Sequence, residues 1–390
     1  MLLNFFKPKR VFLDYAGSTP VDSSVAKEIQ RLQNKFANPS GLYKESVEAK
    51  ELLENFRVRV AKVLNVTKNE IIFTSGATEA NNLALLGVFE ANKKDNFVPH
   101  FITSSIEHSS TLEVCKEIEK RGGEVTVLPV SVDGLVSADS IKNVLKSNTV
   151  MLSLALANSE IGTIQPISEI GKIVKDWNSN NSNKIIFHVD GSGASIYQSF
   201  DIARMGVHVF SLDGSKIYGP KGVGCVFIKS GTNIKPIIFG GGQERGLRSG
   251  TENISSIGGF TLALEMADRN RDTESERLKL IRDYAIEQIL GTFKNVTLNG
   301  SIKHRLPNNV NVCFKGLDAE FATIQLDILG FAVSYSSSCL TLKDDLSSYV
   351  IRALGKTEDC SKSSLRFTFG RDTKKGDIDK LIVALKKVVK

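Results

Sequence analysis

The feature that most constrains the fold of this chain is an alternation of short apolar runs with helical segments between residues 71 and 228. The apolar runs, rich in β-branched and aromatic residues, cover 71–74, 101–103, 125–128, 151–156, 185–189, 207–211 and 223–228. Between them lie segments with helical periodicity, at about 77–89, 109–120 and 167–177. Strands that alternate with helices predict an α/β fold with a mostly parallel sheet covered on both faces. Ligands of such sheets bind beyond the carboxyl ends of the strands.

This alternation stops near residue 254. A long, charged, amphipathic helix is predicted from about 258 to 290, and it is followed by strands at 310–314 and 365–368 and a final helix at 377–389. This second pattern is typical of a smaller α+β domain. We therefore predict a large domain at 15–255 and a small C-terminal domain at 256–390, which residues 1–14 join.

The composition excludes several classes of protein. Hydrophobic residues make up 41% and charged residues 24%, as in ordinary globular proteins. No stretch approaches the roughly 20 consecutive apolar residues of a membrane helix. The net charge of +7 is spread thinly, with small basic clusters at 7–10 and 386–390. A nucleic-acid binder would carry a basic stripe beside base-reading or stacking residues, so we expect neither nucleic acid nor membrane as a partner.

The cysteines and histidines indicate neither disulfides nor a metal. The five cysteines are an odd number without a Cys-x-x-Cys pair, and the five histidines lack metal-binding spacing. A disulfide framework is therefore not expected, and four of the cysteines are interpreted as packing residues. The apolar stretch at 1–6 precedes the basic cluster, the reverse of a signal peptide, so a cytoplasmic location is predicted.

Three segments at predicted strand ends could carry chemistry. Residues 76–79 (GATE) begin a helix, where free N–H groups can hold a phosphate, although a plain turn capped by Thr78 explains them equally well. Asp190 ends one strand and Lys216 follows the next, 26 residues later. Each has a structural explanation by itself, as a capping acid or a solvated amine. Together, a phosphate cradle, an acid and an amine are what pyridoxal phosphate requires.

The chain also resembles a known family over almost its whole length. The motifs that carry the resemblance are FLDYA at 12–16, NPS at 38–40, TSGATEANN at 74–82, EH at 107–108, NSEIG at 158–162, KIYGPKG at 216–222, GGGQERG at 240–246, RSGTEN at 248–253, SC at 338–339, YVIRALG at 349–355 and LRF at 365–367. They are similar to the motifs of class V pyridoxal-phosphate enzymes, and specifically of cysteine desulfurases that supply sulfur for iron–sulfur clusters. The resemblance implies fold-type I with a seven-stranded sheet.

The resemblance also implies roles for individual residues. Lys216 would form the Schiff base and move the substrate's α-proton, Asp190 would pair with the pyridinium nitrogen, and His108 would stack on the ring and shuttle protons. Phosphate would be bound by Ala77 and Thr78, with Thr251 reaching over from the partner subunit of a homodimer. The cofactor or the L-cysteine substrate would be contacted by Asn38, Asn158 and Arg366, the last holding the substrate carboxylate. Cys339 would take the sulfur as a persulfide and release alanine, and a sulfur-acceptor protein would follow.

Several family positions are altered around the cofactor. Members usually have Ser-x-His before the lysine, where this chain has Asp213-Gly214-Ser215. An ionised Asp213 beside a phosphate would cost on the order of 4 kcal/mol at 4 Å and an effective dielectric near 20. Asp213 is therefore expected to point away, to be protonated, or to weaken cofactor binding, while Ser215 can donate one hydrogen bond. Gly193 stands in place of a glutamine, and Tyr43 in place of a histidine.

Two hypotheses about function follow. The first is a working cysteine desulfurase with a remodelled cofactor pocket, which the retained Lys216 and Cys339 favour. The second is a diverged paralogue whose fold serves as a scaffold or partner-binding subunit. Another class V enzyme, such as a selenocysteine lyase or an aminotransferase, is disfavoured because Cys339 lies in the loop typical of desulfurases.

Overall fold

The computed structural model describes residues 10–199, 201–335 and 347–389. Its main sheet has seven strands in the order β2-β8-β7-β6-β5-β3-β4. Their bounds are Ile71–Thr74 (β2), His100–Ser104 (β3), Glu124–Leu128 (β4), Thr149–Ala155 (β5), Ile186–Asp190 (β6), Val209–Asp213 (β7) and Gly224–Ile228 (β8). Strand β8 is antiparallel to both of its neighbours, and the other strands run parallel to one another. The predicted mostly parallel, seven-stranded sheet is confirmed.

The apolar runs became strands because both faces of this sheet are buried. Successive side chains of a strand point to opposite faces. In β6, Ile186 packs into the cluster on one face and Phe187 into the cluster on the other. Strand β4 lies at the edge of the sheet and is only partly buried, which explains its mixed composition. Continuous apolar runs are therefore the sequence signature of the central strands.

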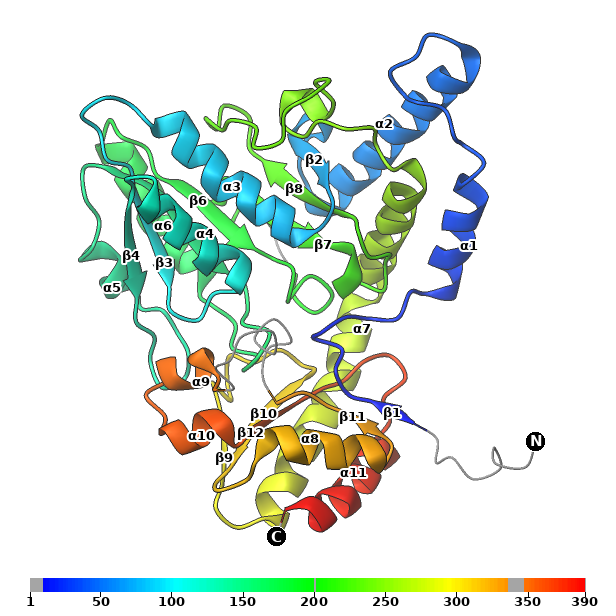
Figure 1. Ribbon diagram of the computed structural model, residues 1–390, viewed down its shortest axis with the longest axis vertical. Helices are drawn as coiled ribbons and strands as arrows, with labels where there is room; N and C mark the ends of the chain where they lie inside the picture. The colour runs from blue at the N-terminus through cyan, green and yellow to red at the C-terminus, as the bar shows by residue number, and fades with distance from the viewer. Residues whose placement is uncertain (1–9, 200, 336–346, 390) are drawn as a thin grey trace.

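Helices cover the two faces of the large sheet. Helices α3 (Ala77–Asn92) and α4 (Ser109–Lys120) pack on one face, and α6 (Ile167–Asn180) packs on the other (Figure 1). All three match predicted helical segments. Before residue 71, ahead of the segments for which elements are predicted, the structure has two further helices, α1 (Ser23–Leu32) and α2 (Lys44–Leu64). Their buried residues recur at helical spacing, as Leu53, Phe56, Val60 and Leu64 do in α2.

Helix α7 (Ile254–Thr292) connects the two parts of the molecule (Figure 1). It packs against α1 and α2, and also against α11, β9 and β10 of the C-terminal part. A Cβ atom at Gly258 would lie 2.2 Å from Leu32 Cδ1, so this position of α7 needs glycine for close approach to α1. Because α7 contacts both parts, the domain boundary predicted at 255 stays a prediction.

The C-terminal part has a three-stranded antiparallel sheet in the order β12-β10-β9, with β9 at Val296–Leu298, β10 at Asn309–Phe314 and β12 at Ser364–Thr368. Strand β1 (Val11–Phe12) pairs in parallel with β11 (Phe331–Ala332). The remaining helices are α5 (Ala138–Lys142), α8 (Ala319–Ile328), α9 (Tyr349–Ala353), α10 (Glu358–Lys362) and α11 (Lys375–Val388). Within the described part of the chain, no helix combines the length and apolarity needed to span a bilayer.

One expectation about cysteines is wrong. Cys313 on β10 and Cys360 on α10 form a disulfide, which the spacing of the cysteines in the sequence does not indicate. Cys115 and Cys225 are buried free thiols, in agreement with a packing role. The two cysteines are 47 residues apart in sequence, and the disulfide arises because β10 and α10 pack together in the C-terminal part.

Candidate active site

A cavity of ≈ 260 Å³ lies at the carboxyl ends of three neighbouring strands of the large sheet. The last residues of β5, β6 and β7 line it, namely Ala155, Asp190 and Asp213. The predicted site residues that border this cavity are Ala77, Thr78, His108, Asn158, Asp190, Asp213, Ser215, Lys216 and Arg366. The expected place of the site, at the carboxyl edge of the sheet, therefore agrees with the structure.

Asp190 is held in one orientation by two donors. Its Oδ2 accepts a hydrogen bond from Asn81 Nδ2 at 2.8 Å, and its Oδ1 accepts one from the backbone N–H of Ser192 at 2.9 Å. Asn81 is fully buried on α3 and also donates to Ser110 Oγ at 2.9 Å. The sequence signal for Asn81 was a polar residue among the apolar positions of a helix. It is a positioning residue for Asp190, a role that the motif alone did not reveal.

Lys216 lies in a single 3₁₀ turn (Gly214–Lys216) directly after β7. Its Nζ donates to the carbonyl oxygens of Ala16 at 2.8 Å and Gly17 at 2.6 Å. Thr19 Oγ1 also donates to the carbonyl of Ser215 at 2.9 Å. The segment that follows β1 thus forms one wall of the cavity and holds the amine at its edge.

His108 caps the N-terminus of α4. Its Nδ1 accepts the backbone N–H of Ser110 at 3.1 Å and lies 2.8 Å from Ser110 Oγ. Because Nδ1 accepts from a backbone donor, the neutral imidazole carries its proton on Nε2. The capping bond therefore selects the tautomer that can donate a proton from Nε2.

Asn158 shapes the loop after β5. Its Nδ2 donates to the carbonyl of Ile106 at 2.7 Å, and its Oδ1 accepts the backbone N–H groups of Glu160 and Ile161, both at 2.9 Å. The amide oxygen therefore accepts two hydrogen bonds from its own loop and stabilises the conformation of that loop. The predicted contact of Asn158 with cofactor or substrate stays a prediction.

Arg366 places a buried positive charge at the border of the cavity. The residue is 2% exposed on β12, and its Nη2 donates to Asp14 Oδ1 at 2.7 Å. Its Nη1 lies 3.4 Å from the carbonyl oxygen of Ser159. A planar guanidinium held in this way is suited to binding a carboxylate. The pairing with Asp14 had no signal in the sequence beyond the motif at 12–16.

Asp213 does not point away from the predicted phosphate cradle. Its Oδ2 accepts the backbone N–H of Ala77, the first residue of α3, at 2.9 Å. Its Oδ1 accepts the backbone N–H of Ser215 at 2.8 Å and the hydroxyl of Ser215 at 2.6 Å. The hydroxyl expected to be available to a phosphate thus donates to Asp213. Of the three expected outcomes for Asp213, pointing away is wrong.

Glu107, just before His108, is a buried acid to which the motif at 107–108 assigns no role. It is 1% exposed, and Ser104 Oγ donates to its Oε1. Burial and, to a smaller extent, the nearby charge of Asp190 together raise the pKa of Glu107 to about 8. At neutral pH Glu107 is therefore largely protonated.

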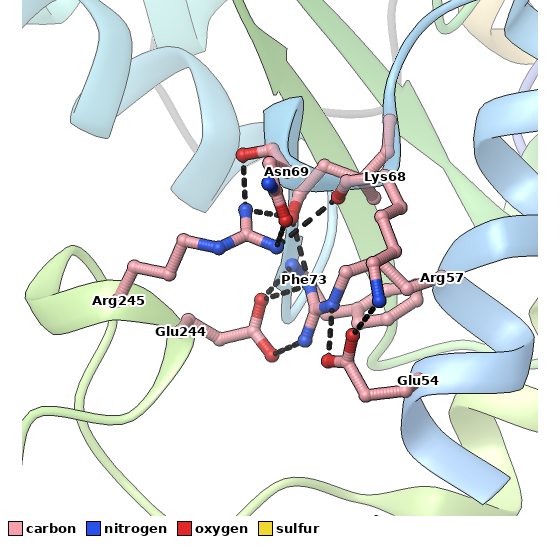
Figure 2. A network of polar contacts seen from close by, with 8 residues as sticks. Glu54, Arg57, Lys68, Asn69, Phe73, Glu244 and Arg245 are labelled. Carbon is pink, nitrogen blue, oxygen red and sulfur yellow. Dashed lines mark hydrogen bonds and ion pairs between the residues drawn. The ribbon is translucent and has the colours of Figure 1, made fainter. Parts of the chain in front are cut away.

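The segment with the motif at 240–246 is fastened by a buried ion pair (Figure 2). Both guanidinium Nη atoms of Arg57 donate to Glu244, at 2.7 and 2.8 Å, and the backbone N–H of Phe73 donates to Glu244 Oε2 at 2.8 Å. Glu244 and Arg245 have φ of 48° and 59°, a left-handed conformation that these contacts hold in place. The motif thus anchors the segment that leads to Thr251.

A second ion pair links the same segment to the first turn of α3. Arg248 Nε donates to Glu79 Oε1 at 2.9 Å, and the other carboxylate oxygen of Glu79 accepts the backbone N–H of Ser75 at 2.8 Å. The loop and the predicted phosphate cradle are therefore positioned together.

Among the predicted site residues that the structure describes, Asn38 and Thr251 do not border this cavity. Asn38 is exposed between α1 and α2, where its Oδ1 accepts the backbone N–H of Ser40 at 2.9 Å, and Thr251 is also exposed. Tyr43, the residue just before α2, is 55% exposed and does not border the cavity either. Cys339 lies outside the described residues. Gly193 does border the cavity, and a Cβ there would lie 3.3 Å from the carbonyl oxygen of Ala157.

Comparisons with known proteins agree with this arrangement. The family described as aminotransferase class-V matches residues 11–381. The cysteine desulfurase IscS of Clostridium botulinum (strain Hall) is 40% identical, over 98% of this chain and 95% of the relative. The protein of the same name from Dictyoglomus turgidum is 38% identical, with the same coverage.

Solved structures show the same likeness. A NifS-like protein superposes with a TM-score of 0.88 at 30% identity, covering 97% of this chain and 98% of the other. The NifS-like protein of Rickettsia africae gives 0.85 at 29% identity, covering 97% and 99%. The chain therefore belongs to the class-V aminotransferase family and, within it, to the cysteine desulfurases.

Proposed function

We propose that this chain is a pyridoxal-phosphate-dependent cysteine desulfurase that converts L-cysteine to L-alanine and passes the sulfur to Cys339. The observation that carries the proposal is that one cavity is bordered by Lys216, Asp190, His108 and the buried Arg366. An amine for the aldehyde, a carboxylate for the ring nitrogen and a cation for the substrate carboxylate are the groups this chemistry needs. The alternative of an inactive scaffold is supported by no feature of this group of side chains.

The residues fit the cofactor at its aldehyde and ring. The Lys216 amine would hold the aldehyde, and the Asp190 carboxylate, oriented by Asn81, would keep the ring nitrogen protonated. When bound, pyridoxal phosphate supplies an electron sink that stabilises negative charge on the substrate's α-carbon. At the phosphate end the fit is poorer, because Asp213 already accepts the N–H group of Ala77.

The chain's own side chains would then move protons and orient the substrate. Arg366 would bind the substrate carboxylate, and Lys216 would carry the α-proton. His108 would donate from Nε2, which carries the proton of the neutral ring because Nδ1 accepts from Ser110. In the overall reaction the carbon–sulfur bond of cysteine breaks and a sulfur–sulfur bond to Cys339 forms. L-cysteine and a protein thiol give L-alanine and a protein persulfide, so no external oxidant or reductant is consumed.

The homodimer belongs to the same proposal. Thr251 and Asn38 lie outside the cavity of their own chain, so any contact with a cofactor or substrate would be made in a partner subunit. Large apolar side chains are exposed as well, with Phe36 at 84%, Leu42 at 97% and Phe239 at 82%. A dimer interface would bury such residues. A sulfur-acceptor protein and a cytoplasmic location stay predictions from the sequence.

The test is to supply the purified protein with pyridoxal phosphate, L-cysteine and a thiol reductant, and to measure alanine and sulfide together. We expect both products in equal amounts, and neither from the Lys216→Ala variant. The Cys339→Ser variant should lose sulfide release while it still binds the cofactor at one equivalent per chain. Sulfide release that survives this substitution would remove Cys339 from its role. Absence of both products from the cofactor-loaded wild type would contradict the proposed function.

A further inference from the structure

The side-chain carboxylate of Asp213 lies at the N-terminus of α3. The first N–H groups of a helix have no partner within the helix and attract negative charge, which makes them a common phosphate site. Here the N–H of Ala77 donates to Asp213 Oδ2 at 2.9 Å, across 136 residues of sequence. Because α3 has 16 residues, its N-terminus carries the full partial charge of a helix dipole.

The carboxylate of Asp213 is held there from both sides. Ser215 donates to the other oxygen through its backbone N–H at 2.8 Å and its hydroxyl at 2.6 Å. A Cβ atom added to Gly76 would lie 3.0 Å from Asp213 Oδ2, so the carboxylate sits against the backbone just before α3. Asp213, Ser215, Ala77 and Thr78 all border the cavity that also contains Lys216.

We propose that Asp213 determines specificity at the phosphate end of the cofactor. This inference rests on the proposed function. A phosphate that enters the cavity meets a carboxylate on the same N–H group, so it must either displace Asp213 or bind beside a like charge. The pocket therefore gains little from the phosphate, and it discriminates only weakly between pyridoxal phosphate and pyridoxal, which has a hydroxyl group at that position.

The test compares the two aldehydes on the cofactor-free protein by isothermal titration calorimetry. For the wild type we expect pyridoxal phosphate to bind less than about tenfold more tightly than pyridoxal. The Asp213→Asn variant keeps the shape and an oxygen that can accept from Ala77, but it removes the charge. It should raise the preference for pyridoxal phosphate by about tenfold or more, mainly through tighter binding of the phosphate form.

A matched control separates the local effect from net charge. Asp139 is an exposed acid on α5, with its side chain 87% exposed and 3.7 Å from Lys142, and it does not border the cavity. The Asp139→Asn variant changes the net charge of the chain by the same amount and should leave both affinities at wild-type values. Inorganic phosphate gives a second measurement, because it should raise the melting temperature of the cofactor-free Asp213→Asn protein more than that of the wild type.

The outcomes separate this inference from the proposed function. A wild type that prefers pyridoxal phosphate by about a hundredfold or more, with the same preference in Asp213→Asn, would overturn the inference and leave the proposed function standing. Equal gains in Asp213→Asn and Asp139→Asn would also overturn it, because the effect would then be one of overall charge. If neither aldehyde binds to any of the three proteins, the proposed function fails and the inference fails with it.

Discussion

The guanidinium of Arg366 on β12 donates to the carboxylate of Asp14, at 2.7 Å and across 352 residues of sequence. Two residues further along the same N-terminal segment, the carbonyls of Ala16 and Gly17 accept from Lys216 Nζ. One short segment thus contacts both the proposed carboxylate-binding cation and the proposed amine. The segment therefore helps to position Arg366, which would bind the substrate carboxylate, relative to Lys216, which would hold the cofactor's aldehyde.

The first prediction concerns the geometry of Arg366. In the Arg366→Lys variant the charge remains, but the fork of donors that holds Asp14 and would hold a carboxylate is lost. We expect KM for L-cysteine to rise about tenfold or more, because one bidentate, charge-assisted contact is removed. The affinity for pyridoxal phosphate should change little, and calorimetry on the cofactor-free variant checks this. The exposed Arg31, paired with Glu28 on α1, offers the matched Arg→Lys control, which should keep the wild-type KM. An unchanged KM in Arg366→Lys would place the substrate carboxylate elsewhere.

A second prediction follows from the buried pair of Arg57 and Glu244. Their side chains are 5% and 1% exposed, so Glu244→Gln removes the buried counter-charge of Arg57 and leaves only the partly exposed Glu54, which accepts from Arg57 Nε at 3.0 Å. Loss of one partner of such a pair costs about 3–5 kcal/mol. Urea unfolding monitored by circular dichroism should show this loss in the free energy of unfolding.

The matched control for the buried pair is Glu28→Gln. Glu28 forms an exposed ion pair with Arg31, and loss of such a pair costs about 1 kcal/mol or less. A Glu244→Gln protein as stable as Glu28→Gln would mean that water or a rearranged loop compensates Arg57. The loop that leads to Thr251 would then not depend on this ion pair.

The third prediction is a pH dependence of stability caused by Glu107. Its pKa is raised from the ordinary 4.5 to about 8, so between these values the folded protein holds a proton that the unfolded chain has released. Stability contributed by this group therefore falls as pH rises from about 4.5 to about 8, by up to ~1.4 kcal/mol per pH unit. Glu107→Gln cannot titrate, so it should become more stable relative to the wild type over this window.

The measurement is urea unfolding of both proteins at several pH values between 5 and 8. Burial lowers the pKa of His188 and of His208 to about 4, which makes stability rise with pH over part of the same range. Both histidines are present in the two proteins, so the difference between the proteins isolates Glu107. A difference that stays constant with pH would show that Glu107 keeps an ordinary pKa.

The fourth prediction tests the disulfide. Cys313 and Cys360 close a loop of 47 residues, which in the chain-entropy treatment is worth about 4 kcal/mol. Reductant should therefore lower the stability of the wild type, and it should have no effect on a Cys313→Ser/Cys360→Ser double variant. Cys115→Ala should keep the response to reductant, because Cys115 is a free buried thiol. The count of titratable thiols in the unfolded protein should rise by two on reduction; an unchanged count would contradict the disulfide.

Most of the large sheet was predictable from the sequence because its signal is local. The predicted run at 71–74 coincides with β2, and the others deviate by a few residues at their ends. A strand buried on both faces is a nearly continuous apolar run, so the sequence alone is enough to identify it. Helices α1 and α2 lie before the alternation of strands and helices, and the surface against which both pack belongs to α7. The helix that provides the partner surface lies about 200 residues later in the chain.

The residues of the candidate site could be predicted where a sequence motif assigns them a role. Lys216, Asp190, His108 and Arg366 could be named in advance, and the structure brings them to one cavity. Asn81 and Asp14 could not be assigned a role, because each acts by contacting another side chain that is distant in sequence.

The sequence by itself determined that this chain forms a doubly covered α/β sheet with a lysine and an acid at its carboxyl edge, because strand burial and strand ends leave patterns within a few residues. Only the tertiary structure decided that Asp213 binds the N-terminus of α3 and that Cys313 bonds to Cys360. Both pairs join elements far apart in the chain. Their geometry depends on how the whole core packs, and no local pattern of residues specifies it.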